Sequence, residues 1–179
     1  LEICKDKLLS YKFLSNKFPF AFTCEYYEKI DTFPLIAKPR FGKGSNNIIK
    51  IENKLDLKYV LGKFKNMIFQ EYLPGTEYTV DVLSDLTEKP IMAIPRIRID
   101  TKAGISVKGK IKRDFMIENL CKKTAETLGI KGPCCIQLKE SENGELKIIE
   151  INPRFGGGTI FTTLAGANFP AMLLEMISN

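Results

Sequence analysis

The sequence predicts an α+β protein built from antiparallel hairpins and helices. Segments 35–38 and 47–51 have the composition of strands and flank a glycine-containing turn, and segments 134–139 and 145–151 flank Asn143-Gly144. Asn-Gly is the strongest short hairpin signal, because both residues tolerate a positive φ. Two hairpins, separated by segments with helical apolar spacing, therefore define the fold class.

The other elements follow from apolar spacing and capping residues. Helices are expected at 5–17, 54–61 and 115–128 and near the C-terminus, and further strands at 67–70, 77–84 and 91–99. Asn53 and Asp114 can cap the second and third helices, and Gly62 and Gly129 can end them. Pro95 lacks the N–H that a ladder needs, so its strand is expected to be an edge strand or bulged.

Residues 100–113 are expected to form a long mobile loop around a weak strand. The segment is polar, contains glycine and is rich in lysine, with little apolar content for packing. Long loops in compact domains are often functional. We expect this loop to close over the site and exclude water.

The composition limits the chemistry. The chain has no histidine, which argues against the common zinc sites and against Ser-His or Cys-His catalysis. The cysteines are odd in number, have no CxxC spacing and lie in expected helices or strands, which predicts free thiols. They are Cys4, Cys24, Cys121, Cys134 and Cys135. Catalysis would depend on carboxylates, amides, lysine and arginine.

The charge and hydropathy of the chain indicate which classes of binding partner to expect. The net charge is +6 and the pI is near 9.0. The lysines are spread along the chain, so a phosphate-rich small ligand explains the surplus better than nucleic acid does. No apolar run approaches the roughly 20 residues that span a bilayer, and the N-terminus lacks a secretory pattern. We expect a cytoplasmic protein with no membrane or nucleic-acid partner.

The second hairpin predicts a metal site. Across its turn, Glu142 is expected to face Glu145. Counting back along the strands then places Gln137 opposite Glu150, with Asn152 on the same face. A buried carboxylate needs a compensating cation, and magnesium combines one or two protein carboxylates with waters and phosphates. The alternative is a solvated glutamate on one face of an amphipathic strand.

Two further segments suggest a nucleotide site. Gly42-Lys43-Gly44-Ser45 can lay N–H groups over phosphates while Lys38 meets their charge, although a plain glycine turn fits equally because the P-loop spacing is absent. Gln70-Glu71-Tyr72-Leu73 ends a buried strand where backbone groups can bind adenine. Glu77 can accept from ribose hydroxyls. An ordinary linker and an exposed glutamate are the alternatives.

Cations supply the candidate catalytic groups. Arg98 shares a strand face with Arg96, and Lys108 lies beyond them, so all three can approach a transferring phosphoryl group. Charges that protect an edge strand explain them nearly as well. Arg154 is better placed, and Gly156-Gly157-Gly158 lets the backbone approach a ligand or forms a flexible connector.

Taken in order, these segments resemble the ATP-grasp superfamily, and among its members one ATP-grasp unit of the carbamoyl phosphate synthetase large chain. The resemblance covers almost the whole chain and rests on segments 6–9, 34–40, 70–81 and 149–154. It implies two α+β lobes that clasp ATP between antiparallel sheets. The small lobe would be 18–72, the large lobe with the metal site 73–179, and 1–17 a leading helix left from a missing N-terminal domain.

The resemblance also implies roles for single residues. Lys38 would contact nucleotide phosphate, Glu71 and Leu73 would present backbone groups to adenine, and Glu77 would hold the ribose. Arg154 matches the arginine that steadies a phosphorylated intermediate. The metal positions are matched by Gln137, Glu150 and Asn152. A glutamine at the first of these favours the carbamoyl phosphate synthetase-like branch over the D-alanine ligase-like branch.

The implied function is an ATP- and Mg-dependent ligase. A substrate carboxylate would attack the γ-phosphate of ATP, and an amine or ammonia would capture the acyl phosphate. Positioning and charge neutralisation by magnesium, Lys38, Arg98 and Arg154 would supply most of the catalysis. A homo-oligomer is a further expectation. The alternative is a nucleotide-binding module or fragment without ligase activity of its own.

Overall fold

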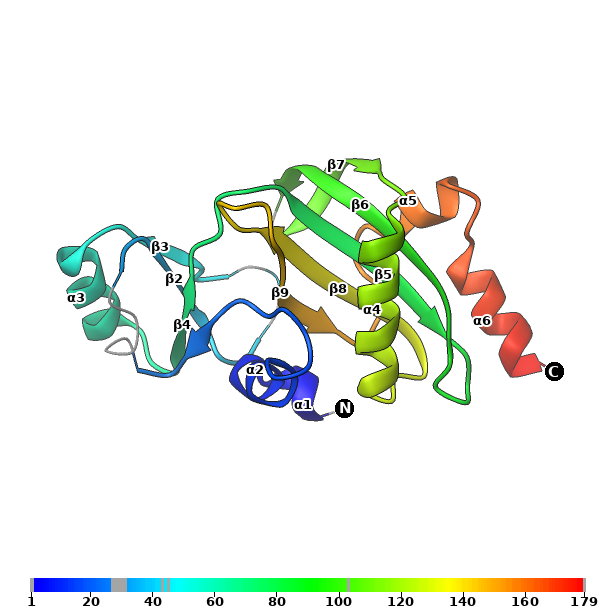
Figure 1. Cartoon of the computed structure of the whole chain (residues 1–179), viewed down its shortest axis with the longest axis horizontal. Helices are drawn as coiled ribbons and strands as arrows, with labels where there is room; N and C mark the ends of the chain where they lie inside the picture. The colour runs from blue at the N-terminus through cyan, green and yellow to red at the C-terminus, as the bar shows by residue number, and fades with distance from the viewer. Residues whose placement is uncertain (1, 27–31, 43, 45, 103, 179) are drawn as a thin grey trace.

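The computed structural model describes residues 2–26, 32–42, 44, 46–102 and 104–178. Its helices are α1 (Glu2–Lys5), α2 (Lys7–Leu14), α3 (Lys54–Lys63), α4 (Phe115–Thr127), α5 (Thr159–Leu164) and α6 (Phe169–Ser178). Its strands are β1 (Thr23–Cys24), β2 (Leu35–Pro39), β3 (Ile49–Ile51), β4 (Met67–Glu71), β5 (Glu77–Ser84), β6 (Pro90–Lys102), β7 (Ile105–Ile111), β8 (Gly132–Glu140) and β9 (Leu146–Asn152). They form two antiparallel sheets with helices around them, which confirms the α+β class (Figure 1).

The smaller sheet has the strand order β1-β4-β2-β3, and α3 packs on it (Figure 1). The predicted first hairpin is confirmed, with Leu35 opposite Ile51. Its core is apolar and contains Cys24, Leu35, Ala37, Ile51, Leu57, Val60 and Phe69. The small sheet thus has a hydrophobic core of its own.

Helix α3 begins as predicted but ends later. Asn53 accepts from the N–H groups of Leu55 and Asp56, which confirms its role as the N-cap. Gly62 was expected to end the helix, and this is wrong. A glycine ends a helix by adopting a positive φ, and Gly62 is not among the glycines that do so. The helix continues to Lys63.

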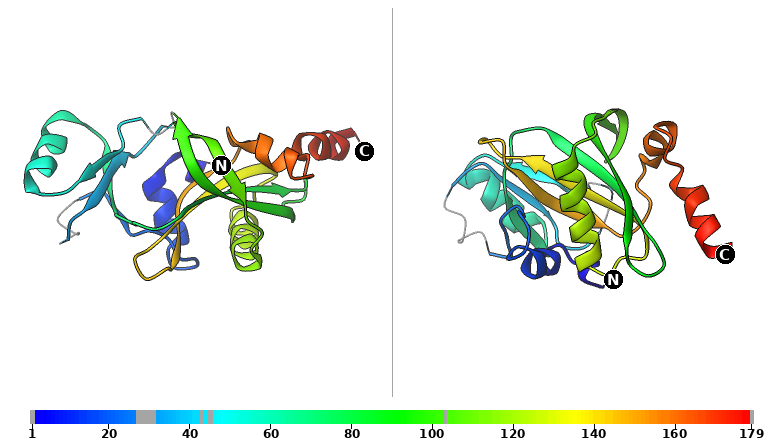
Figure 2. Two further views of the ribbon diagram at one scale, coloured as in Figure 1. Left: turned by 90° about the horizontal axis from the view of Figure 1, so that it is seen from above. Right: turned by 45° about the vertical axis from the view of Figure 1, so that its right-hand side comes forward.

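The larger sheet has the strand order β7-β6-β5-β8-β9. Successive residues of one strand point to opposite faces, and Val82 and Leu83 accordingly enter different apolar clusters. The first cluster lies beneath α4, and the second beneath the C-terminal helices, on the other side of the sheet (Figure 2). Asp114 caps α4 by accepting from Met116 and Ile117, and Gly129 follows the helix with φ +62°, both as predicted.

The expected mobile loop over 100–113 is instead largely a strand. Residues 105–111 form β7, which pairs with β6. The prediction was wrong because ladder hydrogen bonds need no apolar side chain, and lysines suit an edge strand whose outer side faces solvent. Pro95 belongs to β6, which lies inside the sheet. Pairing with β7 begins only at Arg96, so the missing N–H of Pro95 falls beyond the end of that ladder.

The second hairpin forms with a different turn from the one expected. Ser141, not Glu142, faces Glu145, since the Ser141 N–H donates to the Glu145 carbonyl at 2.8 Å. With this three-residue turn and no bulge, every pair farther from the turn would be shifted by one residue from the predicted register. A bulge between Gln137 and Leu138 restores the register, and Gln137 does lie opposite Glu150 as predicted.

The N-terminal segment differs in its bounds from the single helix expected at 5–17. Asp6 interrupts it, because its side chain caps α2 by accepting from Leu8 and Leu9. The chain then covers the outer edge of β9. The Ile148 N–H donates to the Pro19 carbonyl, and the Ala21 N–H donates to the Ile148 carbonyl, both at 2.9 Å.

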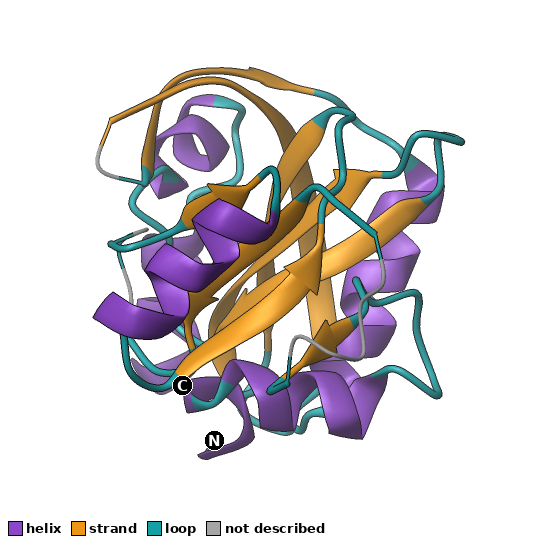
Figure 3. Ribbon diagram, turned by 90° about the vertical axis from the view of Figure 1, so that its left-hand side faces the viewer, coloured by secondary structure: helices purple, strands orange, loops and turns teal. Residues whose placement is uncertain are grey.

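Seen from the small-sheet end, the helices lie around a centre made of strands (Figure 3). Cys4, Cys121, Cys134 and Cys135 are free thiols, as predicted. None of the described helices has the length and apolar character needed to cross a membrane.

Candidate functional site

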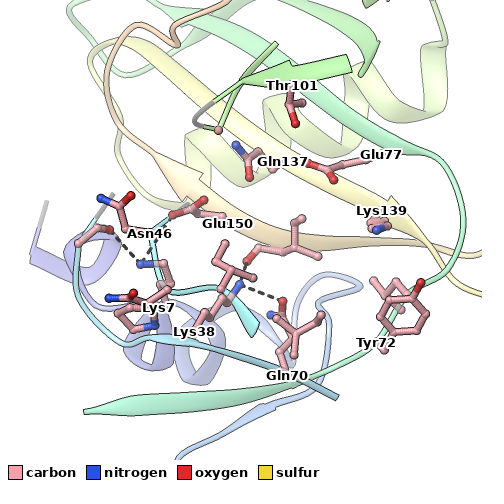
Figure 4. Close-up of a pocket in the computed structure, with 18 of the residues that line it drawn as sticks. Lys7, Lys38, Asn46, Gln70, Tyr72, Glu77, Thr101, Gln137, Lys139 and Glu150 are labelled. Atoms are coloured by element: carbon pink, nitrogen blue, oxygen red, sulfur yellow. Dashed lines mark hydrogen bonds and ion pairs between the residues drawn. The ribbon is translucent and has the colours of Figure 1, made fainter. Parts of the chain in front are cut away.

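A cleft of about 500 Å³ opens between the two sheets. Strands β2 and β4 of the small sheet supply one wall, and β5, β8 and β9 of the large sheet supply the other. Lys7 and Glu150 lie at one end, and Tyr72 and Lys139 lie toward the other (Figure 4). The predicted site residues along it are Lys38, Gly42, Gln70, Glu71, Tyr72, Leu73, Glu77, Arg98, Gln137 and Glu150.

Lys38 is a buried cation at the centre of this cleft. Its Nζ donates to Gln70 Oε1 at 2.9 Å and to the Ile149 carbonyl at 3.0 Å. Gln70 is held in turn by a 2.8 Å hydrogen bond to Thr23 Oγ1. Burial is the main cause that lowers the pKa of Lys38 to about 8; the charge of Glu150 opposes the shift, and that of Lys7 contributes to it. The site therefore holds an amine that can change its charge near neutral pH.

The bulge in β9 creates one of the two acceptors for Lys38. Leu138 pairs with Ile148 and Gln137 pairs with Glu150, which leaves Ile149 without a partner on β8. A bulged residue is unpaired in the ladder, and the Ile149 carbonyl accepts from Lys38 instead. The same irregularity that sets the face of Glu150 thus joins the two sheets.

The predicted metal ligands lie close together. Glu150 and Asn152 share a face of β9, and Gln137 lies opposite Glu150 on β8. The Glu150 side chain is 23% exposed, and Lys7 Nζ lies 3.8 Å from its Oε1. Among the described residues, no group of three or more His, Cys, Asp or Glu side chains is arranged to hold a metal ion. One carboxylate with two amide oxygens fits magnesium that is bound together with nucleotide phosphates, rather than a dedicated metal cage.

The segment at the end of β4 that is predicted to bind the base lines the cleft. Glu71 is fixed from two directions: Lys147 Nζ lies 2.9 Å from both of its carboxylate oxygens, and the Phe22 N–H donates to Oε1 at 2.7 Å. Its own N–H donates to the Phe22 carbonyl. Leu73 makes no backbone–backbone hydrogen bond to any described residue outside the regular ladders. The Leu73 backbone is therefore better placed than the Glu71 N–H to meet a base edge.

Glu77 and Arg98 form an ion pair in the wall of the cleft that the larger sheet supplies. Arg98 Nη1 donates to Glu77 Oε1, and Arg98 Nη2 donates to the Gly104 carbonyl at 2.9 Å. The Arg98 side chain is only 7% exposed. The arginine expected to act on a phosphoryl group thus already holds the carboxylate expected to bind ribose.

A second pocket of about 350 Å³ adjoins the first. The two share Arg98, Gly104, Gln137 and Glu150 as lining residues. The second pocket is also lined by Gly44, Arg96, Asn152, Arg154 and the glycines 156–158. Arg154 is exposed, and its Nη2 lies 3.4 Å from Asn152 Oδ1.

The glycine run packs against the sheet rather than acting only as a connector. A Cβ at Gly158 would lie 2.7 Å from Arg96 Nη2, and one at Gly156 would lie 3.2 Å from Asp81 Oδ1. Arg96 and Asp81 form a buried ion pair, and Thr162 Oγ1 donates to Asp81 at 2.6 Å. Arg96 is thus neutralised beneath the pocket and is not a free cation.

One predicted site residue in the described part of the chain lies outside both pockets. Lys108 is exposed on β7, opposite Asp100, and lines neither pocket. The geometry therefore does not bring it near the other candidates. Lys43 and Ser45 lie outside the described residues, so their expected phosphate contacts stay predictions. Their neighbours Gly42 and Gly44 have φ +106° and +81°.

Two lysines that line the cleft were not predicted as site residues from the sequence. Lys7 donates to the Gly42 carbonyl at 3.0 Å and lies beside Glu150. Segment 6–9 was noted only for its resemblance. Lys139 lies opposite Glu77, with Nζ 5.7 Å from the centre of the Tyr72 ring. Strand alternation could have found it, because Lys139 shares a face with Gln137.

The fold and the cleft define a two-sheet α+β protein with buried and half-buried cations between its sheets, a site suited to a phosphorylated ligand. The chain belongs to the ATP-grasp family. The family described as "ATP-grasp in the biosynthetic pathway with Ter operon" matches residues 63–179. ATP and Mg²⁺ are the cofactors of ATP-grasp ligases, in agreement with the predicted pair.

Known proteins resemble this chain in sequence and in fold. It is 32% identical over 108 residues to the D-alanine–D-alanine ligase of Thermotoga petrophila, which covers 56% of this chain and 35% of that protein. The biotin carboxylase of Campylobacter jejuni, solved in complex with βγ-ATP, matches 98% of this chain and 46% of its own, with TM-score 0.80 and 16% identity. The D-alanine–D-alanine ligase of Coxiella burnetii matches 97% and 56%, with TM-score 0.76 and 15% identity. This chain thus spans about a third of the curated relative.

Proposed function

We propose that this chain is the ATP-grasp unit of an ATP- and Mg-dependent ligase that activates a carboxylate for capture by an amine or ammonia. The observation that carries the proposal is the shared wall of the two pockets, formed by Arg98, Gly104, Gln137 and Glu150. A ligand in the first pocket and one in the second would meet there. A group transfer between two small molecules needs that arrangement.

When bound, Mg-ATP would supply a γ-phosphoryl group to the substrate carboxylate, releasing ADP, and the amine would then displace phosphate from the acyl phosphate. The side chains of this chain bind and orient. Lys38 and Lys7 would offset phosphate charge, while Glu150, Gln137 and Asn152 would hold the metal. Arg154, which is exposed and lines the second pocket, would steady a phosphorylated substrate. No protein nucleophile is required.

We further propose a carbamoyl phosphate synthetase-like subtype, because an amide, Gln137, stands at the first metal position. The proposed organisation is a leading helix at 1–17, a small lobe at 18–72 and a large lobe at 73–179. An N-terminal domain before the leading helix would complete the substrate site, and the unit would act within a homo-oligomer. The second candidate is a nucleotide-binding module without ligase activity, which the single metal carboxylate favours.

Thermal melting with Mg-ATP tests the nucleotide site. We expect Mg-ATP to raise the melting temperature and Glu150→Ala to abolish the rise, because Glu150 is the carboxylate of the metal site. Glu142→Ala is the matched control, since Glu142 is exposed in the turn of the same hairpin. An undiminished rise in the Glu150 variant would sink the metal assignment.

ADP formation tests the reaction. The intact protein would be screened with pairs of carboxylates and amines, including bicarbonate with ammonia. ADP release that depends on both partners supports the ligase. Nucleotide binding without stimulation by any pair would favour the binding module.

A further inference from the structure

We propose that Arg98 is a positioning residue that couples the nucleotide cleft to the second pocket. Occupation of Glu77 by ribose hydroxyls would fix Arg98, and Arg98 would fix the end of the β6–β7 hairpin that walls the second pocket. This inference rests on the proposed nucleotide site.

The first link is the ion pair between Glu77 and Arg98. A buried guanidinium needs a compensating carboxylate, and Glu77 is the one that Arg98 contacts among the described residues. The Nε of Arg98 is buried without a partner in the described part of the chain. Arg98 therefore depends on Glu77 for its charge partner, and its position follows that of the carboxylate.

Glu77 can bind ribose while it keeps this pair. Arg98 donates to Oε1, and no described residue donates to Oε2. The Glu77 side chain is 29% exposed and lines the first cleft. A carboxylate accepts through both oxygens, so hydroxyl donors at Oε2 would restrict its rotation without displacing the arginine.

The second link joins Arg98 to the hairpin. Arg98 Nη2 donates to the Gly104 carbonyl at 2.9 Å, where the chain turns from β6 into β7. The next residue, Ile105, lies against the glycine run, since a Cβ at Gly157 would meet its side-chain atoms at 3.0 to 3.3 Å. Gly104, Ile105 and Gly157 all line the second pocket. Fixing Arg98 thus holds one wall of that pocket in place.

Hydrogen–deuterium exchange over segment 104–111 tests this coupling in the intact protein. The two probes are Mg-ATP and Mg-2′,3′-dideoxy-ATP, which keeps the base and phosphates but lacks both ribose hydroxyls. We expect Mg-ATP to slow exchange about fivefold, the effect of one hydrogen bond worth about 1 kcal/mol. The dideoxy nucleotide, at saturation, should leave exchange near the rate of the free protein.

Variants separate coupling from simple binding. Arg98→Met, measured at an Mg-ATP concentration that saturates the variant in its melting shift, should lose the protection, whereas Lys110→Met, which removes an exposed charge from the same hairpin, should retain it. Equal protection by both nucleotides in the unaltered protein, or protection that survives Arg98→Met, would overturn the coupling. Absence of any melting shift with Mg-ATP would instead refute the proposed nucleotide site, so the two failures are distinguishable.

Discussion

Lys38 should make nucleotide affinity fall as pH rises above 8. Its amine is buried in the cleft with a pKa of about 8. Phosphate groups favour the charged amine and would raise this pKa in the complex. Binding above pH 8 must therefore take up a proton, and the energy needed to charge the amine weakens binding.

The size of the effect follows from the fraction of charged amine in the free protein. With a pKa of about 8, this fraction falls from about 0.9 at pH 7 to about 0.09 at pH 9. The dissociation constant for Mg-ATP should rise about tenfold over this range, equivalent to about 1.4 kcal/mol. The free energy of unfolding of the free protein should instead rise with pH. The unfolded chain binds more protons between pH 8 and 10.5, so unfolding of the free protein should become up to about 3 kcal/mol more costly there.

Calorimetric titration with Mg-ATP at pH 7, 8 and 9 measures both the affinity and the protons taken up. Repeating each titration in buffers of different ionisation enthalpy counts the protons, and about 0.9 should be absorbed per site at pH 9. Lys7→Met is an informative variant, because the charge of Lys7 lowers the pKa of Lys38. The pH midpoint should then move higher. An unchanged dissociation constant from pH 7 to 9, with no proton uptake, would refute the reasoning.

Three further substitutions test the packing around the site through the free energy of unfolding in denaturant. Gly158→Ala should cost about 1–3 kcal/mol by overpacking, because its Cβ would lie 2.7 Å from Arg96 Nη2. Asp81→Ala should cost about 3–5 kcal/mol, since it leaves the buried Arg96 without its carboxylate. Asp114→Ala should cost about 1 kcal/mol by removing the N-cap of α4.

Each expectation has its own contradicting result. Wild-type stability of the Gly158 variant would show that the glycine run can move away from the sheet. A loss below about 1 kcal/mol at Asp81 would mean that water or another group satisfies the arginine. An Asp114 loss equal to that of an exposed mid-helix control, Lys123→Ala, would show that the cap adds nothing.

The facing pair at the metal site was predictable from sequence, although one step behind it was wrong. Glu142 does not face Glu145, and a bulge at Ile149 compensates for the different turn. Any pairing of Gln137 with Glu150 encloses the same number of residues. The predicted two-residue turn without a bulge and the observed three-residue turn with a bulge therefore both place Gln137 opposite Glu150. Only the bulged arrangement leaves the Ile149 carbonyl for Lys38, and turn propensity alone does not reveal it.

Contacts between distant segments account for what sequence reasoning missed. The buried state of Lys38 depends on Gln70 and Ile149, which come from other strands. The loop expected at 100–113 failed as a prediction because pairing with β6 stabilises a polar segment that lacks an apolar pattern. Helix capping depends on neighbouring residues alone, and it was predicted correctly at Asn53 and Asp114.

The segment that covers β9 has a practical consequence for shortened forms of this protein. The family match begins at residue 63, and a fragment cut there would lack Pro19 and Ala21. The N–H and carbonyl of Ile148 would then be exposed on an outer strand edge. Unpaired strand edges recruit other chains and promote aggregation. Soluble expression should therefore require residues well upstream of the family match, whatever the catalytic residues themselves need.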